Sequence, residues 1–407
     1  MTHTPDDQAF LHGASRLAQA IRDARQVMFD ASWVAESPDP EQERAAAERQ
    51  LKNQLAAALD QGFVLDDARQ PELRLLDPHN QFGLVNPDNR YHIANIETPG
   101  TYTLRGRRGT SADLNIQLGG GDIADPNLDP VSLLTLDDLE VEDDGTFVIT
   151  ISDVDSGRGN WLNNTRGHLT AKNILIRESF MDWNTEVGTT WYLERTDTRG
   201  MPSPLSDRDL VNQQYERAAQ YLVDSARTWV GLVEGLRRDI PKEGVLLPPR
   251  ESKLPGQYTS VGIFPMRPDK ATIITLTRAP ARYQAAQVGD LWFNGRDFCH
   301  RQTSLTLSQA RPTRDDPSTY QLVLSAKDPG VANWLDPAGA STAFMYVRWQ
   351  GLQQGCTIDP STYPRAREID FDQIREALPD EPSFSAAERA AQLAARQASG
   401  LRSPRAF

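Results

Sequence analysis

The chain has 407 residues, 39% of them hydrophobic and 24% charged, a balance that predicts two or three folded domains rather than a disordered chain. A formal net charge of −13 would repel phosphate backbones and anionic membranes, so we expect neither nucleic acid nor membrane as a partner. No apolar run approaches the ~20 residues that span a bilayer. The first residues lack the basic and apolar regions of a signal peptide, and the two cysteines, Cys299 and Cys356, are too few for a disulfide framework. We therefore expect a cytoplasmic protein.

Helices are predicted at the start of the chain. Apolar residues recur at steps of three and four through residues 6–34, which indicates an amphipathic helix. A second segment, 40–61, is rich in Ala, Glu, Gln and Lys and ends near Gly62, a residue type common after a helix C-terminus. Residues 1–72 are therefore assigned to a helical N-terminal region.

Short alternating runs replace this pattern from about residue 73 and predict a first β-sandwich unit over 73–200. Its strands are expected at 101–104, 112–118, 146–151, 173–177 and 190–194. The acidic segment 119–145 has no counterpart later in the chain and is predicted to be an inserted loop. Whether this loop binds a cation stays open.

The strongest predicted helix covers 206–236, where apolar residues keep one face through eight positions. A proline-rich connection follows, so 201–256 is read as a helix and linker. Strands resume and predict a second β-sandwich unit over 257–356. The tail, 357–407, carries one more helix that begins at the capping box Ser385–Glu388. This helix either docks on a neighbouring element or remains solvated.

The two β units look alike in sequence. Residues 83–117 open with a Gly-to-Pro-Asp motif at 83–88, and residues 262–294 open with a similar motif at 262–269. An Asn-Trp-Leu motif then follows in each, with its tryptophan at Trp161 and Trp334. Order and spacing are nearly kept, which indicates an internal duplication. We therefore predict a mainly β protein of two duplicated antiparallel β-sandwich units, with helices at the N-terminus, the centre and the C-terminus.

The second unit also resembles a known family. The matching stretches are Val261–Asp269, Gly289–Asn294, Arg301–Leu305, Asp328–Asp336 and Val347–Gly351. Over about 258–351 the chain is similar to the bacterial DUF1214 domain family, whose function is unknown. The resemblance implies an all-β domain with helical additions. It implies no reaction, and no catalytic residue is carried over.

The usual motifs of phosphate, dinucleotide and metal sites are missing from the sequence, so we expect no cofactor and no metal. The densest polar and aromatic stretch is 289–302, where strand alternation would place Asp290, Trp292 and Asn294 on one face and a turn would bring His300 back over them. In 177–183, Glu178 and Asp182 would share a strand face. The candidate acid/base residues are therefore His300, Asp290, Glu178 and Asp182, against a structural reading of each.

Duplicated halves often bind a ligand where they meet. The wall of such a site is predicted from nine residues: Arg90, Tyr91, Trp161, Arg177, Trp292, Asn294, Arg301, Trp334 and Arg348. Each Asn-Trp pair has a competing structural interpretation, in which the asparagine braces a turn and the tryptophan packs in the core.

Two functions remain open. One is a cofactor-independent enzyme that acts on a small, largely apolar organic molecule by acid/base chemistry such as hydrolysis, elimination or isomerisation. The alternative is a non-catalytic β-sandwich module that binds carbohydrate, lipid or protein. A small-molecule ligand is the expected partner, and self-association into a homo-oligomer is left open.

Overall fold

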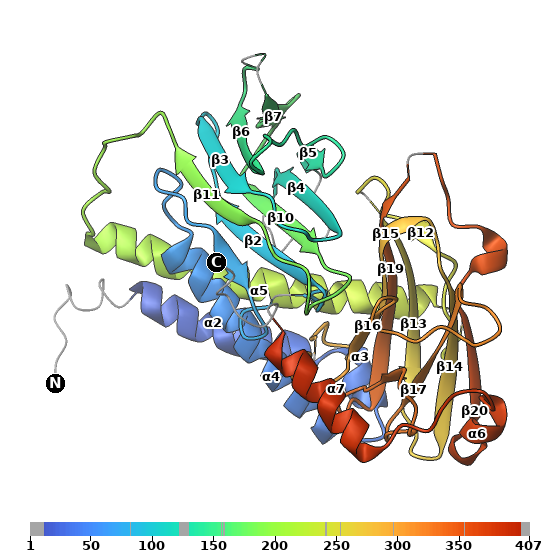
Figure 1. Cartoon of the computed structure of the whole chain (residues 1–407). Helices are drawn as coiled ribbons and strands as arrows, with labels where there is room; N and C mark the ends of the chain where they lie inside the picture. The colour runs from blue at the N-terminus through green and yellow to red at the C-terminus, as the bar shows by residue number, and fades with distance from the viewer. Residues whose placement is uncertain are drawn as a thin grey trace, which may run out of the picture.

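The computed structural model describes residues 12–81, 83–121, 130–155, 157, 159–240, 242–252, 254–295, 297–353 and 355–399 (Figure 1). It confirms the predicted architecture, a mainly β chain of antiparallel sheets with helices at the N-terminus, the centre and the C-terminus.

The helical layer consists of α2 (His12–Phe29), α3 (Ser32–Glu36), α4 (Pro40–Leu59), the π-helix η1 (Asp60–Val64) and α5 (Arg208–Asp239). The helix expected over 6–34 is two helices, and its residues 6–11 lie outside the described part. The break falls at Asp30 and Ala31, and the backbone N–H of Ser32 then donates to a carboxylate oxygen of Glu234 on α5 at 2.8 Å. Helix α5 begins where the Asp207 side chain accepts from the Leu210 N–H, and it ends with two arginines that suit a helix C-terminus.

The first sandwich packs a five-stranded sheet, in the order β1-β2-β10-β4-β5, on a four-stranded sheet, β11-β3-β6-β7. The strands are β1 (Arg74–Leu76), β2 (Asn89–Asn95), β3 (Tyr102–Arg107), β4 (Asp113–Gly119), β5 (Pro130–Thr135), β6 (Thr146–Ser152), β7 (Asn160–Asn163), β10 (Asn173–Ser179) and β11 (Thr190–Arg195). A small hairpin, β8 (Thr165–Arg166) and β9 (Leu169–Thr170), follows β7. Alternate residues from both sheets, such as Leu104, Ile116 and Ile176, are fully buried between them.

The second sandwich packs the order β12-β13-β19-β15-β16 on β18-β17-β14-β20. Its strands are β12 (Arg250–Glu251), β13 (Tyr258–Pro265), β14 (Lys270–Thr277), β15 (Ala281–Gly289), β16 (Ser304–Thr306), β17 (Thr319–Ser325), β18 (Trp334–Leu335), β19 (Thr342–Leu352) and β20 (Arg365–Asp370). The short helices η2 (Pro360–Thr362), η3 (Phe371–Gln373) and α6 (Ile374–Ala377) lie around β20, and α7 (Ala386–Ala398) comes last. The core of the second sandwich contains Ile274, Leu322 and Val347.

The two sandwiches share one strand order: each strand in the two sheets of the first sandwich has a counterpart at the equivalent place in the second. In both, the strand that carries the Asn-Trp motif pairs in parallel with its neighbour.

Three sequence-based expectations need correction. The motif at 83–88 precedes β2, whereas 262–269 covers the end of β13 and the turn after it, so these two motifs do not correspond. The segment 119–145 is not simply an insertion, since it contains β5, the counterpart of β16, although residues 122–129 lie outside the described part. The second sandwich also extends beyond residue 356, because β20 completes it.

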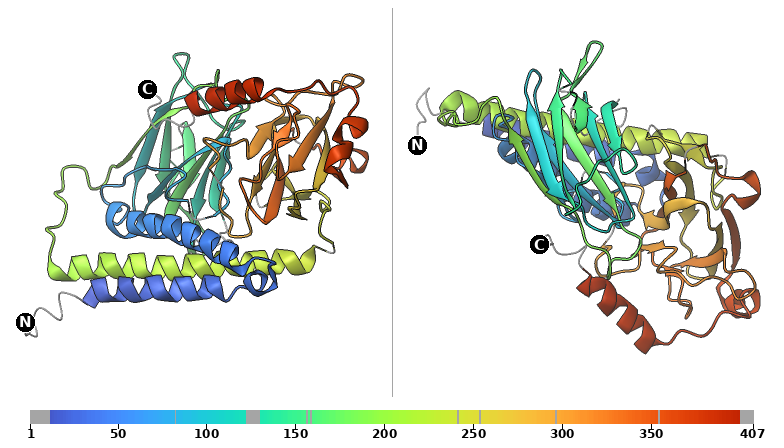
Figure 2. Two further views of the ribbon diagram at one scale, coloured as in Figure 1. Left: turned by 90° about the horizontal axis from the view of Figure 1, so that it is seen from below. Right: turned by 45° about the horizontal axis from the view of Figure 1, so that its top comes forward.

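Helix α5 runs beneath both sandwiches, and α7 lies across them on the opposite side (Figures 1 and 2). One apolar cluster joins the helices to the outer faces of both five-stranded sheets. Its members include Leu222 and Val233 of α5, Leu175 of the first sandwich and Ile263 of the second. The helical layer thus holds the two sandwiches side by side.

Candidate functional site

Backbone strain marks one region of the molecule. Among the described residues, three that are not glycine have a positive φ: Phe293 (55°), Asp297 (41°) and Ala338 (53°). Such conformations cost free energy for a residue with a Cβ and tend to gather at functional sites. Asp297 and Ala338 both line the same cavity, and Phe293 directly precedes a third lining residue, Asn294.

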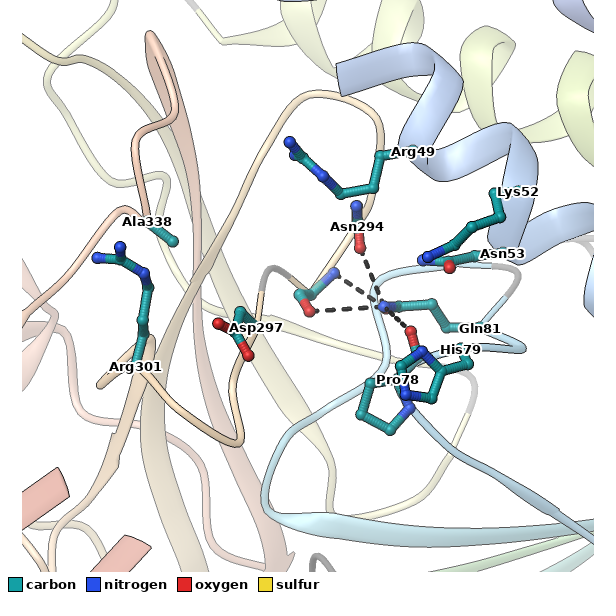
Figure 3. Close-up of a pocket in the computed structure, with 11 residues that line it drawn as sticks. Arg49, Lys52, Asn53, Pro78, His79, Gln81, Asn294, Asp297, Arg301 and Ala338 are labelled. Carbon is teal, nitrogen blue, oxygen red and sulfur yellow. Dashed lines mark hydrogen bonds between the residues drawn. The ribbon is translucent and has the colours of Figure 1, made fainter. Parts of the chain in front are cut away.

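This cavity lies where α4, the loop after β1 and the loop after β15 meet, and it has a volume of about 330 Å³ (Figure 3). Helix α4 contributes Arg49, Lys52 and Asn53, and the 289–302 segment contributes Asn294, Gly295, Asp297 and Arg301. Pro78, His79, Gln81 and Ala338 complete the lining. Most of these side chains are polar, and the cavity lies at the junction of separate parts of the fold, where ligand sites are common.

The loop after β15 is held in place by side-chain hydrogen bonds to its backbone. One oxygen of Asp290 accepts from the N–H groups of Trp292 and Asn294 at 3.0 and 3.2 Å. From the other wall, the Gln81 side chain accepts from the Gly295 N–H at 3.0 Å and donates to the Asn294 carboxamide oxygen at 2.9 Å (Figure 3). Trp292 is buried against Trp33, with ring centroids 4.9 Å apart. The loop is therefore preorganised.

The cavity presents three cations, several amides and the carboxylate of Asp297. Arg49 and Lys52 are exposed on α4, and no described residue provides either with a carboxylate partner. Arg301 donates to Asp336 at 2.9 Å. Two buried amide atoms, Asn53 Oδ1 and Asn294 Nδ2, find no hydrogen-bond partner in the described part of the chain. Because an unpaired buried polar atom is costly, each would gain from a polar partner that reached it.

Asp297, which lines the cavity, pairs with His300, which is not among the lining residues. The ring nitrogen Nδ1 of His300 is 2.6 Å from an Asp297 carboxylate oxygen, and the His300 side chain is 47% exposed. This differs from the expected pairing of His300 with Asp290, which binds the turn instead. Strand β15 ends at Gly289, so the alternation expected for Asp290, Trp292 and Asn294 does not occur. Asn294 lines the cavity, whereas Trp292 belongs to the core.

Glu178 and Asp182 lie apart from this cavity and do not form a pair. Glu178 is buried inside the first sandwich, where one oxygen accepts from the Ser111 hydroxyl and from the N–H and hydroxyl of Thr189. Strand β10 ends at Ser179, so Asp182 is not on it. Its carboxylate accepts from the Asn184 N–H and the Thr185 hydroxyl and so stabilises a turn.

The predicted ligand wall is divided among several places. Arg90 lies over the Phe180 ring at the end of the first sandwich. Burial lowers the pKa of Arg90, and the nearby charge of Glu178 partly opposes this by raising it. Arg301 reaches the cavity of Figure 3. Arg177, Tyr91 and Arg348 lie on the outer faces of the five-stranded sheets, where the two sandwiches meet.

Both Asn-Trp motifs are structural. Asn160 Oδ1 accepts from the Glu140 N–H at 2.7 Å while its Nδ2 donates to two backbone carbonyls. Asn333 makes the same three kinds of bond, accepting from the Arg311 N–H at 2.8 Å. The indoles of Trp161 and Trp334 are only half-buried and donate to Ser152 and Ser325 respectively.

No sequence motif marked the residues that helix α4 contributes to the cavity. Arg49, Lys52 and Asn53 sit within an ordinary Ala- and Glu-rich helix, and Gln81 lies in an irregular segment. Only the strained loop opposite them contained a dense polar stretch. Polar residues on the buried side of α4, such as Gln50 and Gln54, were a usable clue, since a helix packed on apolar neighbours rarely carries them.

A second polar cluster connects the sandwiches to α7. Asp88 is fully buried and accepts from Trp183 Nε1 and the Tyr283 hydroxyl at 2.9 and 2.8 Å. Burial raises the pKa of Asp88, and the charge of Arg396 on α7 opposes that rise. The same burial raises the pKa of Tyr283 well above its ordinary value. The helix expected to dock or remain solvated is therefore docked, through Arg389 and Arg396, both buried.

Two further features are absent from the described part of the chain. It contains no group of three or more His, Cys, Asp or Glu side chains arranged to hold a metal ion. None of its helices combines the length and the apolar character that crossing a bilayer would require.

Comparison with known proteins places the fold but not the chemistry. No family model matches the chain, and no curated protein does. An uncharacterised protein from Burkholderia cenocepacia has a similar crystal structure, with a TM-score of 0.78 and 25% identity over 90% of this chain and 99% of that one. A protein from Vibrio parahaemolyticus reaches a TM-score of 0.42 at 10% identity, covering 79% of this chain and 99% of its own. A salicylate 1,2-dioxygenase from Pseudaminobacter salicylatoxidans reaches only 0.19, so neither of these two supports an argument. The chain thus shares its fold with an uncharacterised bacterial protein.

Proposed function

We propose that the chain is a small-molecule-binding protein and that the cavity beside α4 binds a polar organic acid. The observation that carries this proposal is the backbone strain at Phe293, Asp297 and Ala338, which all lie at this cavity or next to it. Strained positions persist where surrounding structure enforces them, and the cost is retained where function needs the geometry.

The lining indicates the kind of ligand. Arg49 and Lys52 supply positive charge without a carboxylate of the described residues to neutralise it, which favours an anionic group. Asn53 and Asn294 offer an acceptor and a donor that suit hydroxyl groups. A hydroxylated acid such as a sugar acid matches both features. Of the two functions open from sequence, this supports the binding module, and within it the carbohydrate alternative.

The test is calorimetric titration with glucuronate, and with glucose as the uncharged comparison. We expect glucuronate to bind more tightly than glucose. The double variant Arg49→Gln/Lys52→Gln should weaken glucuronate binding at least about tenfold, since hydrogen bonds to charged groups contribute about 1.5–3 kcal/mol. Arg44→Gln is the matched control, because Arg44 is on the same helix outside the cavity. Equal affinity in the double variant and the control would contradict the proposal.

Acid/base catalysis is the second candidate, and the Asp297–His300 pair favours it. A carboxylate that holds one imidazole nitrogen leaves the other free to transfer a proton, as a general base requires. If the protein turns over the acid it binds, NMR of that acid incubated with the protein should show a new species. His300→Gln should abolish this conversion and leave binding intact. An unchanged spectrum with a tightly bound acid would leave binding as the function.

We also propose that the two sandwiches derive from one duplicated unit. The shared strand order and the matching Asn160 and Asn333 bonds support this. Membership of the second sandwich in the DUF1214 family, suggested by its motifs, remains part of the proposal. A cytoplasmic location is likewise proposed, and it agrees with the two cysteines, neither of which is in a disulfide.

A further inference from the structure

The surface where the two sandwiches meet carries equivalent arginines. Arg177 on β10 lies opposite Asn115 of β4, and Arg348 on β19 lies opposite Ala285 of β15. Each donates to the glutamine two residues further along the partner strand: Arg177 to Gln117 at 2.8 Å, and Arg348 to Gln287 at 3.0 Å. The same arginine–glutamine pair therefore recurs in both halves.

The two outer faces touch at equivalent positions. Ser179 and Gln350 each follow their arginine by two residues, and the Ser179 hydroxyl donates to the Gln350 side-chain oxygen. In a two-fold interface, equivalent residues meet at the axis. One pair of equivalent positions therefore meets between the sandwiches, and each arginine lies two residues from it along its strand.

Neither arginine has an acidic partner among the described residues. The partners of Arg177 are amide oxygens, and those of Arg348 are an amide oxygen, the Leu84 carbonyl at 3.5 Å and the Tyr346 ring at 4.6 Å. Burial and the nearby charge of Arg348 lower the pKa of Arg177 to about 10, against the effect of Tyr91. Two like charges near each other in a poorly solvated place are costly unless an anion joins them.

The two arginines and the tyrosines beside them are partly buried but remain accessible to water. Arg177 and Tyr346 lie deep enough for burial to shift both pKa values, lowering that of Arg177 and raising that of Tyr346. Both side chains nevertheless keep surface that water can reach, as do Tyr91 and Arg348. The two guanidinium groups are therefore not sealed off by packed atoms.

We propose that the surface between the two sandwiches binds a small oxyanion, a carboxylate or phosphate group, held by Arg177 and Arg348 with Tyr91 and Tyr346 as walls. This site is separate from the cavity beside α4. Bidentate guanidinium groups suit both kinds of oxyanion. Because the anion would neutralise the repulsion between the arginines, its binding stabilises the folded chain.

Thermal unfolding of the full chain tests the proposal, with succinate and inorganic phosphate compared with chloride at equal ionic strength. Succinate, phosphate or both should raise the Tm of the wild type, and which of them does so identifies the group. Arg177→Gln and Arg348→Gln should each abolish the rise and weaken binding of that anion at least tenfold. In chloride, Arg177→Gln should not lower the Tm, since it removes an uncompensated charge.

Two controls separate this site from others. Arg282 also lies on β15 near the same surface, but it has two carboxylate partners, Asp113 and Asp137, at 2.8 Å each. Arg282→Gln should keep the response to the anion, and so should Arg49→Gln/Lys52→Gln. If neither anion stabilises the wild type, or if Arg177→Gln and Arg348→Gln respond like Arg282→Gln, the proposal is wrong. Loss of the response only in Arg49→Gln/Lys52→Gln would assign the anion to the other cavity and also overturn it.

Discussion

Replacing Arg396 by methionine should destabilise the chain more than any surface change. The guanidinium donates to the Phe298 carbonyl at 2.6 Å, to the Ser304 carbonyl at 3.2 Å and to the Ser304 hydroxyl at 2.8 Å. It also lies 4.0 Å from the centre of the Trp183 ring. Arg396 therefore joins α7 to both sandwiches.

The magnitude follows from what the substitution leaves behind. Arg396 compensates the charge of Asp88 through the Ser304 hydroxyl, to which both are hydrogen-bonded, and not by direct contact. Removing one partner of a direct buried ion pair costs about 3–5 kcal/mol, which is therefore the upper range expected here. For a chain of this length, that corresponds to a Tm lower by about 4–6 °C if the chain unfolds in one step. Differential scanning calorimetry gives both quantities.

The cost should depend on pH. Burial raises the pKa of Asp88 in the folded chain, so Asp88 contributes most stability below its ordinary value of 3.8 and loses that contribution as the pH rises through its raised value. Without Arg396 the ionised carboxylate becomes costlier. The Arg396→Met deficit should therefore grow between about pH 4 and pH 7. An equal deficit at both pH values, together with additive costs in Asp88→Asn/Arg396→Met, would refute this reasoning.

Four more substitutions have distinct expected results. Asn160→Ala and Asn333→Ala should each cost about 1–3 kcal/mol in urea unfolding, and by similar amounts, because they remove matching bonds to the backbone; a large difference would argue against equivalent roles. Trp292→Ala should cost about 3–5 kcal/mol in the same assay, as a truncation of a buried aromatic residue, and a loss below 1 kcal/mol would contradict its place in the core. Tyr283→Phe should cost about 1–3 kcal/mol at neutral pH and less in acid, since Asp88 loses a donor that its ionised form needs; a cost that rises in acid would contradict this.

Local patterns in the sequence predict the elements well. The periodicity of α5 and the capping box of α7 give those helices within a few residues, because both depend on neighbours in the chain. The competing structural interpretation of the Asn-Trp motifs agrees with the hydrogen bonds of Asn160 and Asn333, but the two tryptophans are only half-buried and do not pack fully in the core. The false match between 83–88 and 262–269 arose because a short Gly-to-Pro-Asp pattern is common in turns, and it cannot show which turn of the fold it occupies.

The candidate sites were harder to predict because they depend on which surfaces meet. The segment 289–302 was singled out correctly as a place of unusual composition, and three of its side chains, those of Asn294, Asp297 and Arg301, reach the cavity. Its partners on α4 come from more than 200 residues earlier and have no distinctive pattern. Arg177 and Arg348 were both among the residues predicted to line a ligand site, but their lack of acidic partners emerges only from the packing of two sheets.

Helix α5 limits how the molecule can move. Its 32 residues form a continuous rod roughly 48 Å long that packs against both sandwiches through one apolar cluster. Rotating one sandwich away from the other would bend this helix or break its apolar contacts, so α5 opposes a hinge motion between the halves. We therefore expect any exchange of a ligand held between them to occur on the opposite side, where Arg389 and Arg396 attach α7, and protection of amide hydrogens there should be the most sensitive to occupancy.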